Sequence, residues 1–97
     1  MNEENRVLQV YKNSRRRSHV ELLIDTLSAM KSESQPTRIM YTTNLSWISL
    51  RAILRTLERQ GAAAKDVCPN DKEVWHLTTR GREALNTWDK LMRSFLD

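Results

Sequence analysis

Residues 36–61 read PTRIMYTTNLSWISLRAILRTLERQG, and this stretch has the pattern of two helices joined by a short turn. Pro36 suits the first turn of a helix, because the N–H group that proline lacks would have no partner there in any case. We therefore predict a short helix from Pro36 to about Thr43, in which Ile39 and Met40 face inward.

A longer helix follows a tight turn at Asn44 and Leu45. Ser46 can cap this helix, because a serine hydroxyl accepts a hydrogen bond from a free N–H group of the first turn. Gly61 stands where a left-handed C-terminal cap is expected, so the helix spans about 46–60. Two helices joined by so short a turn form a helix-turn-helix. The buried face of the longer helix is marked by apolar residues at three- and four-residue spacing, which are Leu50, Ile53, Leu54 and Leu57.

The segment that precedes the helix-turn-helix predicts one more helix. Ser18 and Glu21 form a capping-box pattern, in which a serine and a glutamate satisfy each other's backbone N–H groups. Apolar residues then recur at helical spacing as far as Met30. We predict a helix over about 19–31, joined to Pro36 by a polar loop.

The residues after Gly61 predict a β-hairpin and a long last helix. Residues 69–72 read PNDK, a strong turn sequence, and they separate two strand candidates at 62–68 and 73–77. Thr78 is placed to cap a helix over about 79–96. The order helix, helix, helix, hairpin, helix indicates a mainly α (α+β) fold, a winged helix-turn-helix with a two-stranded wing. We divide the chain into a basic N-terminal arm (1–17), a winged helix-turn-helix domain (18–78) and a C-terminal dimerisation helix (79–97).

Two stretches, TRIMYTTNLSW at 37–47 and LTTRGREAL at 77–85, resemble the small archaeal winged-helix DNA-binding proteins of about ten kilodaltons. The resemblance runs over about 17–96. It implies a homodimer on double-stranded DNA, joined by an antiparallel coiled coil of the last helix. The sequence departs from the family at Ala62, Ala63 and Ala64, where large aliphatic residues are usual. We therefore expect a poorly anchored first wing strand.

Positive charge is gathered in the arm and in the helix-turn-helix, within a chain that has 16 Lys and Arg against 12 Asp and Glu. The run Arg15-Arg16-Arg17 suits a minor groove or a row of phosphates, unless it serves only to keep the terminus soluble. Because the total excess is modest, its placement carries more information than its size.

The outward face of the third helix is the candidate DNA-reading surface. Small side chains such as Ala52 allow close approach to a groove floor, and Arg55 and Arg59 can reach guanine edges or phosphates. The alternative is an ordinary solvated face. Residues of the second helix and the wing tip suit phosphate contacts, although the threonines could equally be helix caps. The candidate DNA-binding residues are Arg15, Arg16, Arg17, Arg38, Thr42, Thr43, Ser46, Ile48, Ser49, Arg51, Ala52, Arg55, Arg59 and Lys72.

The last helix carries an apolar seam at spacings of three, four and three residues, which is heptad-like. We interpret it as a dimer interface; the alternative is a helix folded back on its own core. The candidate interface residues are Leu85, Trp88, Leu91, Met92, Phe95 and Leu96.

The sequence gives no positive support for catalysis. His19 and His76 lack acidic partners at metal-ligand spacing, and Cys68 alone cannot form an internal disulfide or a cysteine-cluster metal site. Gly61 and Gly81 are the only glycines, so a glycine-rich phosphate loop is excluded. No apolar run approaches the roughly 18 residues of a membrane span, and no secretory signal is evident. We expect a cytoplasmic, nucleoid-associated protein without metal, cofactor or small-molecule substrate.

These features predict a dimeric duplex-DNA-binding protein, either a transcription regulator or a chromatin-architectural protein, with the third helix in the major groove. The alternative is a protein-interaction module that docks on the transcription machinery through the same helix. Ile48 and the three tryptophans fit that alternative. Trp47 and Trp75 could also stack on unpaired bases, but in so small a domain we expect them in the core.

Overall fold

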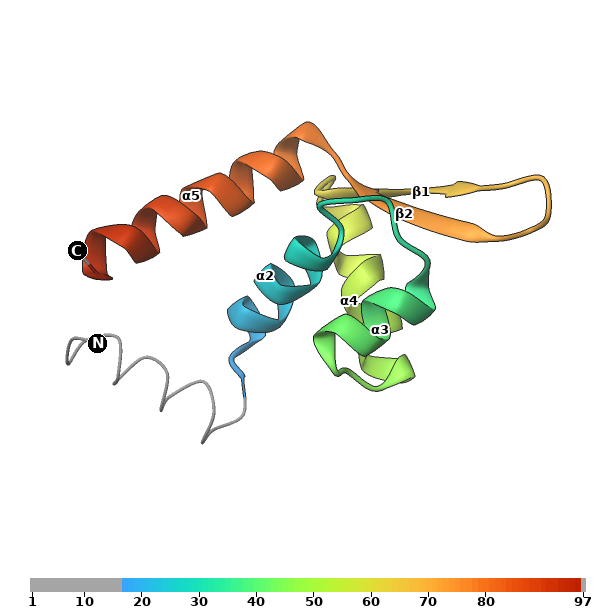
Figure 1. The fold of residues 1–97 in the computed structure, drawn as a ribbon, viewed down its shortest axis with the longest axis horizontal. Helices are drawn as coiled ribbons and strands as arrows, with labels where there is room; N and C mark the ends of the chain where they lie inside the picture. The colour runs from blue at the N-terminus through green and yellow to red at the C-terminus, as the bar shows by residue number, and fades with distance from the viewer. Residues whose placement is uncertain (1–16, 97) are drawn as a thin grey trace.

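The computed structural model describes residues 17–96, and Arg15 and Arg16 lie outside them. The described part contains four helices and one two-stranded antiparallel sheet (Figure 1), which confirms the predicted winged helix. The elements follow one another as α2 (His19–Ala29), α3 (Pro36–Thr43), α4 (Trp47–Arg59), β1 (Ala63–Val67), β2 (Glu73–Leu77) and α5 (Thr79–Leu96).

The helix ends lie where local chemistry places them. The Ser18 hydroxyl accepts a hydrogen bond from the Glu21 N–H at 3.1 Å, and the Glu21 carboxylate accepts one from the Ser18 N–H at 3.3 Å, so the predicted capping box is present. Ser46 caps α4 by accepting a hydrogen bond from the Ser49 N–H at 3.2 Å. Gly61 adopts the expected left-handed conformation, with φ of 74°.

The core lies where α2, α3 and α4 meet the root of the hairpin. Ile39 of α3 and Leu50 of α4 are fully buried, and Trp75 of β2 is almost fully buried, as predicted. The apolar face of α4 is completely covered, because its four predicted members are all buried: Leu50, Ile53, Leu54 and Leu57.

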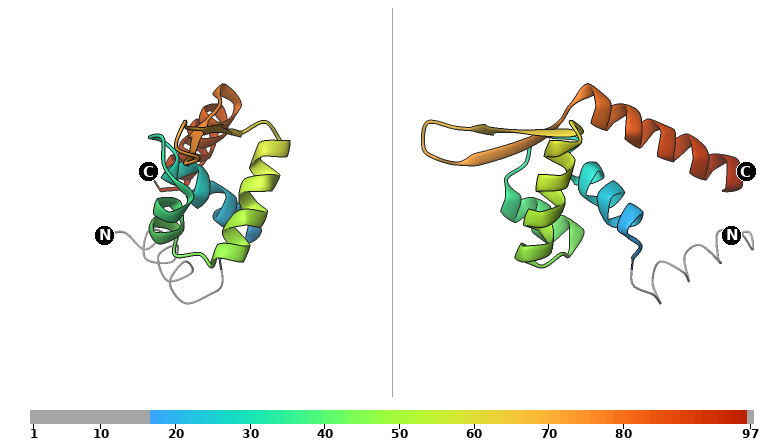
Figure 2. Two further views of the ribbon diagram at one scale, coloured as in Figure 1. Left: turned by 90° about the vertical axis from the view of Figure 1, so that its right-hand side faces the viewer. Right: turned by 180° about the vertical axis from the view of Figure 1, so that it is seen from behind.

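The hairpin is the wing, and it is paired from Ala63 opposite Leu77 at its root to Val67 opposite Glu73 near its tip. Trp75 also pairs with Ser34 in the loop before α3, through N–H to O hydrogen bonds of 2.8 and 3.0 Å. This bridge ties the wing to the helices. Beyond it, the wing and α5 project from the helices in opposite directions (Figures 1 and 2).

The expectation that the first wing strand is poorly anchored was wrong at its root. Ala62 and Ala63 are buried, and the Ala62 carbonyl accepts a hydrogen bond from the Thr78 N–H at 3.1 Å. Gly81 of α5 lies so close to this carbonyl that a Cβ atom there would overlap it. Because Ala62 and Gly81 are small, the backbone at the root of β1 can contact the backbone of α5. This contact anchors the strand root without large aliphatic side chains.

Replacing Gly81 with alanine tests this close approach. The added methyl group would collide with backbone, which cannot rotate away as a flexible side chain can. We expect a loss of about 1–3 kcal/mol or more in the free energy of unfolding, and a fall in Tm on the order of 10 °C, measured by thermal denaturation. Asn86→Ala, at an exposed position of the same helix, is the matched control and should leave Tm unchanged or slightly higher. Equal Tm values for the two variants would contradict the close contact.

Candidate nucleic-acid interface

The outward face of α4 is exposed along its whole length. α4 forms one flank of the domain in the left-hand view of Figure 2. Ile48, Ala52, Arg55 and Arg59 are exposed, and Ile48 reaches 83% exposure. A shallow hollow runs along the C-terminal half of this face, lined by Ala52, Arg55, Thr56, Glu58 and Arg59.

Arg55 and Arg59 are available to a ligand. Within residues 17–96, neither guanidinium group forms a salt bridge or a hydrogen bond with another side chain. A guanidinium group carries five N–H donors in a planar fork that matches phosphate oxygens and the acceptor edge of guanine. The outward face of α4 therefore presents two arginine side chains, one at the middle and one at the end of the helix, that are not held by another side chain of the described residues.

The start of α4 presents small hydroxyl side chains. The hydroxyl groups of Ser46 and Ser49 are hydrogen-bonded to each other at 2.9 Å, and both residues are exposed. Ser46 thus caps the helix while it remains at the surface. The first two residues of α4, Trp47 and Ile48, are however large and exposed, so only Ser49 and Ala52 offer the small side chains that allow close approach to a groove floor.

Arg51 differs from the other two arginines of α4, because the fold already engages it. Its guanidinium group lies 3.1 Å from the Glu73 carboxylate at the start of β2, and 5.5 Å from the ring centroid of Trp47. Trp47 itself is nearly half exposed, so the expectation that it belongs to the core was wrong. Its place in the first turn of α4 puts its ring on the helix surface, under the arginine.

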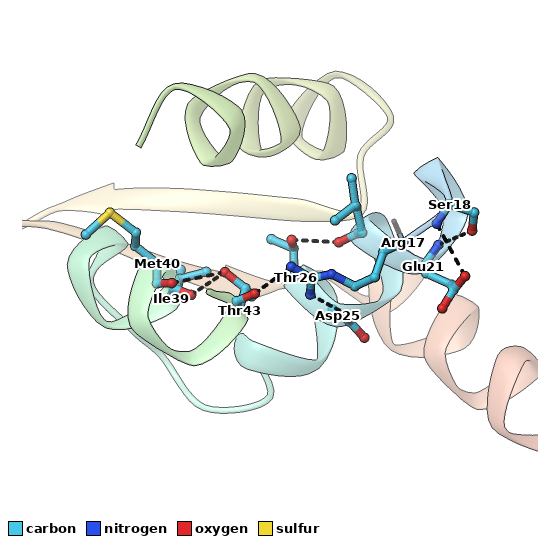
Figure 3. Close-up of polar contacts among 9 residues, drawn as sticks. Arg17, Ser18, Glu21, Asp25, Thr26, Ile39, Met40 and Thr43 are labelled. Atoms are coloured by element: carbon cyan, nitrogen blue, oxygen red, sulfur yellow. Dashed lines mark hydrogen bonds and ion pairs between the residues drawn. The ribbon is translucent and has the colours of Figure 1, made fainter. Parts of the chain in front are cut away.

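Arg17 is engaged in the same way at the other side of the helix-turn-helix (Figure 3). It forms an ion pair of 2.8 Å with Asp25 of α2 and donates a hydrogen bond of 2.8 Å to the Thr43 carbonyl at the end of α3. The last carbonyl groups of a helix have no partner within the helix, so Arg17 satisfies one of them. We assign Arg17 to this structural contact and leave it out of the proposed interface.

The two threonines at the end of α3 are in different environments. The Thr43 side chain is buried, and its hydroxyl donates to the Ile39 carbonyl of its own helix at 2.7 Å, so a phosphate cannot reach it. It does not cap a helix either, because Asn44 is the C-cap of α3 and Ser46 the N-cap of α4. Thr42 is exposed and shares a face of α3 with Arg38 and Tyr41. Tyr41 is 76% exposed and was not among the residues predicted for the interface. Its spacing of three residues from Arg38 could have revealed it.

The wing carries acidic residues beside its lysines. Lys72 is exposed at the tip, as predicted, but Asp71 stands beside it. Lys65 lies 3.5 Å from the Glu73 carboxylate, and the Asp66 carboxylate lies 3.2 Å from a ring nitrogen of His76. Lys72 is therefore the only lysine of the hairpin that is outside a described ion pair.

The apolar seam of α5 is divided between two environments. The first half of α5 packs against the domain's own core, and Leu85 is buried there. Leu85 is therefore not an interface residue. Trp88, Met92 and Leu96 are half-buried. Leu91 and Phe95 are exposed, Phe95 to 62%. The outer half of α5 thus keeps large apolar side chains at the surface.

Other kinds of site find no support in residues 17–96. No group of three His, Cys, Asp or Glu side chains there is arranged to hold a metal ion. None of the described helices combines the length and the apolar character needed to cross a membrane. Cys68 is a half-buried free thiol near the wing tip.

Comparisons with known proteins agree with this geometry. The chain is similar in structure to Sso10a-2, a DNA-binding protein from Sulfolobus solfataricus, with a TM-score of 0.72 and 19% sequence identity over 79% of this chain and 80% of that one. It is also similar to BpsR of Bordetella bronchiseptica, with a TM-score of 0.71 and 15% identity over 96% of this chain and 71% of that one. For BldR, a transcriptional regulator of Sulfolobus solfataricus, the TM-score is 0.70 and the identity 18%, over 97% and 66% of the two chains.

At such low identities, these similarities show the shared fold alone. No curated protein matches the chain. The model of the winged helix-turn-helix family, however, matches residues 16–95, which is most of the sequence. The chain therefore belongs to the winged helix-turn-helix family.

Proposed function

We propose that the protein binds duplex DNA as a homodimer, with α4 in the major groove, and that it acts as a transcription regulator or a chromatin-architectural protein at the nucleoid. One observation carries the proposal. The second helix of a helix-turn-helix has a fully buried apolar face, and its opposite face is exposed and bears two unengaged arginines. Sso10a-2, which shares the fold, is a DNA-binding protein.

The exposed face of α4 suits a major groove, which is wide enough to admit a helix. Ser49 and Ala52 are small enough to let the helix axis approach the base edges. Ile48, at the same end, can contact a thymine methyl group. Arg55 then lies within reach of a guanine edge, and Arg59, one turn further on, within reach of the phosphates.

Phosphate contacts would fix the position of α4 without reading sequence. The exposed face of α3 supplies candidates in Arg38, Tyr41 and Thr42, a guanidinium group and two hydroxyl groups. Arg15 and Arg16 remain candidates outside the described residues. Lys72 is the candidate on the wing, although the neighbouring Asp71 reduces its attraction for phosphate.

The dimer interface is proposed on the outer half of α5. Leu91 and Phe95 expose apolar surface that a second copy of the helix could bury, and half-buried Trp88 and Met92 widen the strip. Large apolar side chains that recur along a projecting helix are typical of a helix–helix interface. A dimer would also present two copies of α4 to one duplex.

A regulator and an architectural protein differ in sequence preference, and the ratio of specific to non-specific affinity separates them.

The second candidate function, a protein-docking module, is favoured by one group of observations. Tyr41, Trp47 and Ile48 are exposed around the helix-turn-helix. A module of that kind would bind DNA weakly and with little dependence on salt.

Binding to random duplex DNA at two salt concentrations tests the proposed function. If the dimer neutralises 6–10 phosphates, affinity should fall roughly 10³–10⁵-fold between 50 and 200 mM salt, because each neutralised phosphate releases counterions. Gel-shift or fluorescence anisotropy titrations measure this. Weak binding whose affinity does not change with salt concentration would instead support the protein-docking function.

Arg55→Ala and Arg59→Ala separate base reading from phosphate binding. Both side chains are exposed, so each substitution should change the free energy of unfolding by no more than about 0.5 kcal/mol. Arg55→Ala should reduce the binding free energy for a selected site by roughly 1–3 kcal/mol and relax sequence preference. Arg59→Ala should weaken binding to all duplexes alike. Arg93→Ala, at an exposed position of α5, is the charge-matched control and should bind as the parent does. If all three variants bind both DNAs normally, α4 does not enter the groove.

Phe95→Glu tests the dimer. Because a carboxylate buried without a partner costs several kcal/mol, the dissociation constant of the dimer should rise about 100-fold or more. Analytical ultracentrifugation measures the change, and circular dichroism checks that the monomer stays folded. Ser94→Glu adds the same charge to the neighbouring exposed position and should leave the dimer intact. A parent protein that sediments as a monomer at micromolar concentration would contradict the interface.

A further inference from the structure

Glu73 holds two cations at the junction of the wing and α4. One carboxylate oxygen lies 3.1 Å from Arg51 Nη1, and the other lies 3.5 Å from Lys65 Nζ. Arg51 belongs to α4, Lys65 to β1 and Glu73 to the first position of β2. A single carboxylate therefore pairs with one positive charge from α4, which carries the proposed DNA face, and one from the wing beside it.

The two cations lie at the edge of that face and remain accessible. The Arg51 side chain is 34% exposed and the Lys65 side chain 40% exposed. Arg51 comes one residue before Ala52 on α4, so it stands on the flank of the helix that is turned toward the wing. A phosphate that reached this flank would meet both cations and the carboxylate that holds them.

We propose that Glu73 restrains DNA binding by keeping Arg51 and Lys65 from phosphates, and this inference rests on the proposed function. DNA carries about one negative charge per 1.7 Å of helix axis. At 0.1 M salt the Debye length is about 10 Å, and charges closer than this are only partly screened. A fixed carboxylate at the edge of the interface therefore repels the nearest phosphates. It also competes with them for the two cations.

The wing does not depend on these ion pairs for its structure. Partly exposed ion pairs contribute only about 0–1 kcal/mol to stability. The hairpin is held by its backbone ladder and by the bridge between Ser34 and Trp75. Arg51 also contacts the Trp47 ring, and this contact does not involve the carboxylate. Loss of the charge on Glu73 should therefore change DNA binding far more than folding.

Glu73→Gln tests the proposal, because glutamine keeps the size and loses the charge. The variant should bind random duplex more tightly than the parent at 50 mM salt. The slope of log affinity against log salt should steepen by about 0.9 for each phosphate gained, so the advantage should shrink about 3.5-fold per phosphate between 50 and 200 mM. Thermal denaturation checks that both proteins are folded.

Two further variants identify the cause. Glu83→Gln makes the same charge change at an exposed position of α5 and should leave the slope unchanged. Arg51→Ala should have little effect in the parent, where the arginine is held, and should remove part of the gain when it is combined with Glu73→Gln.

The outcomes separate this inference from the proposed function. A parent that binds duplex, with equal or weaker binding by Glu73→Gln, overturns the role of Glu73 and leaves DNA binding in place. Equal slopes for Glu73→Gln and Glu83→Gln overturn it as well, since the effect would then be one of net charge. A parent and variant that both fail to bind at 50 mM overturn the proposed function and the inference together.

Discussion

The core and the candidate interface are both organised by the burial of one face of α4. Four apolar side chains, Leu50, Ile53, Leu54 and Leu57, are covered by α2, α3 and the hairpin root. Because an α-helix turns about 100° per residue, burying these positions leaves Ile48, Ala52, Arg55 and Arg59 on the outside. The same packing therefore forms the core and determines which side chains a ligand can meet. The turn at Asn44, with φ of 57°, and the Ser46 cap set where the helix starts.

Around this helix, the arginines of the domain fall into two groups. Arg17 and Arg51 are held by carboxylates and stabilise the surroundings of α4. Arg38, Arg55 and Arg59 form no ion pair within residues 17–96 and are exposed. The sequence shows basic residues in the arm and in the helix-turn-helix, and the structure separates the arginines that carboxylates hold from the arginines that are free to bind. That separation carries the proposed function more directly than the net charge does.

The order of elements and most of their ends could be predicted from the sequence, because they depend on local chemistry. Caps such as Ser18 and Ser46, and the left-handed Gly61, act within a few residues of their own position. Contacts between distant parts of the chain could not be predicted. Arg17 meets Thr43 across 26 positions, and Gly81 meets the Ala62 carbonyl across the hairpin.

The candidate site shows the same limit, because residue type and spacing do not reveal what lies opposite a side chain. Leu85 continues the apolar seam of α5 in the sequence, yet it packs into the domain's own core. Arg51 lies beside the outward face of α4 in the helical pattern, yet a glutamate 22 positions away holds it. Thr43 has a hydroxyl like that of Thr42, yet it is turned into the protein. For Leu85 and Arg51 the neighbours are brought near only by the tertiary fold, whereas the Thr43 hydroxyl donates to Ile39 of its own helix and is buried by the packing around it.

Contact between DNA and the outward face of α4 can be observed residue by residue in an NMR titration of the isotope-labelled protein with a short duplex. We expect the largest changes in backbone amide and arginine side-chain signals at Ile48, Ala52, Arg55 and Arg59, with smaller changes on α3 around Arg38. Signals of the exposed face of α5 around Glu83 should stay in place. Changes confined to the wing or to α5, with those of α4 unmoved, would contradict the claim.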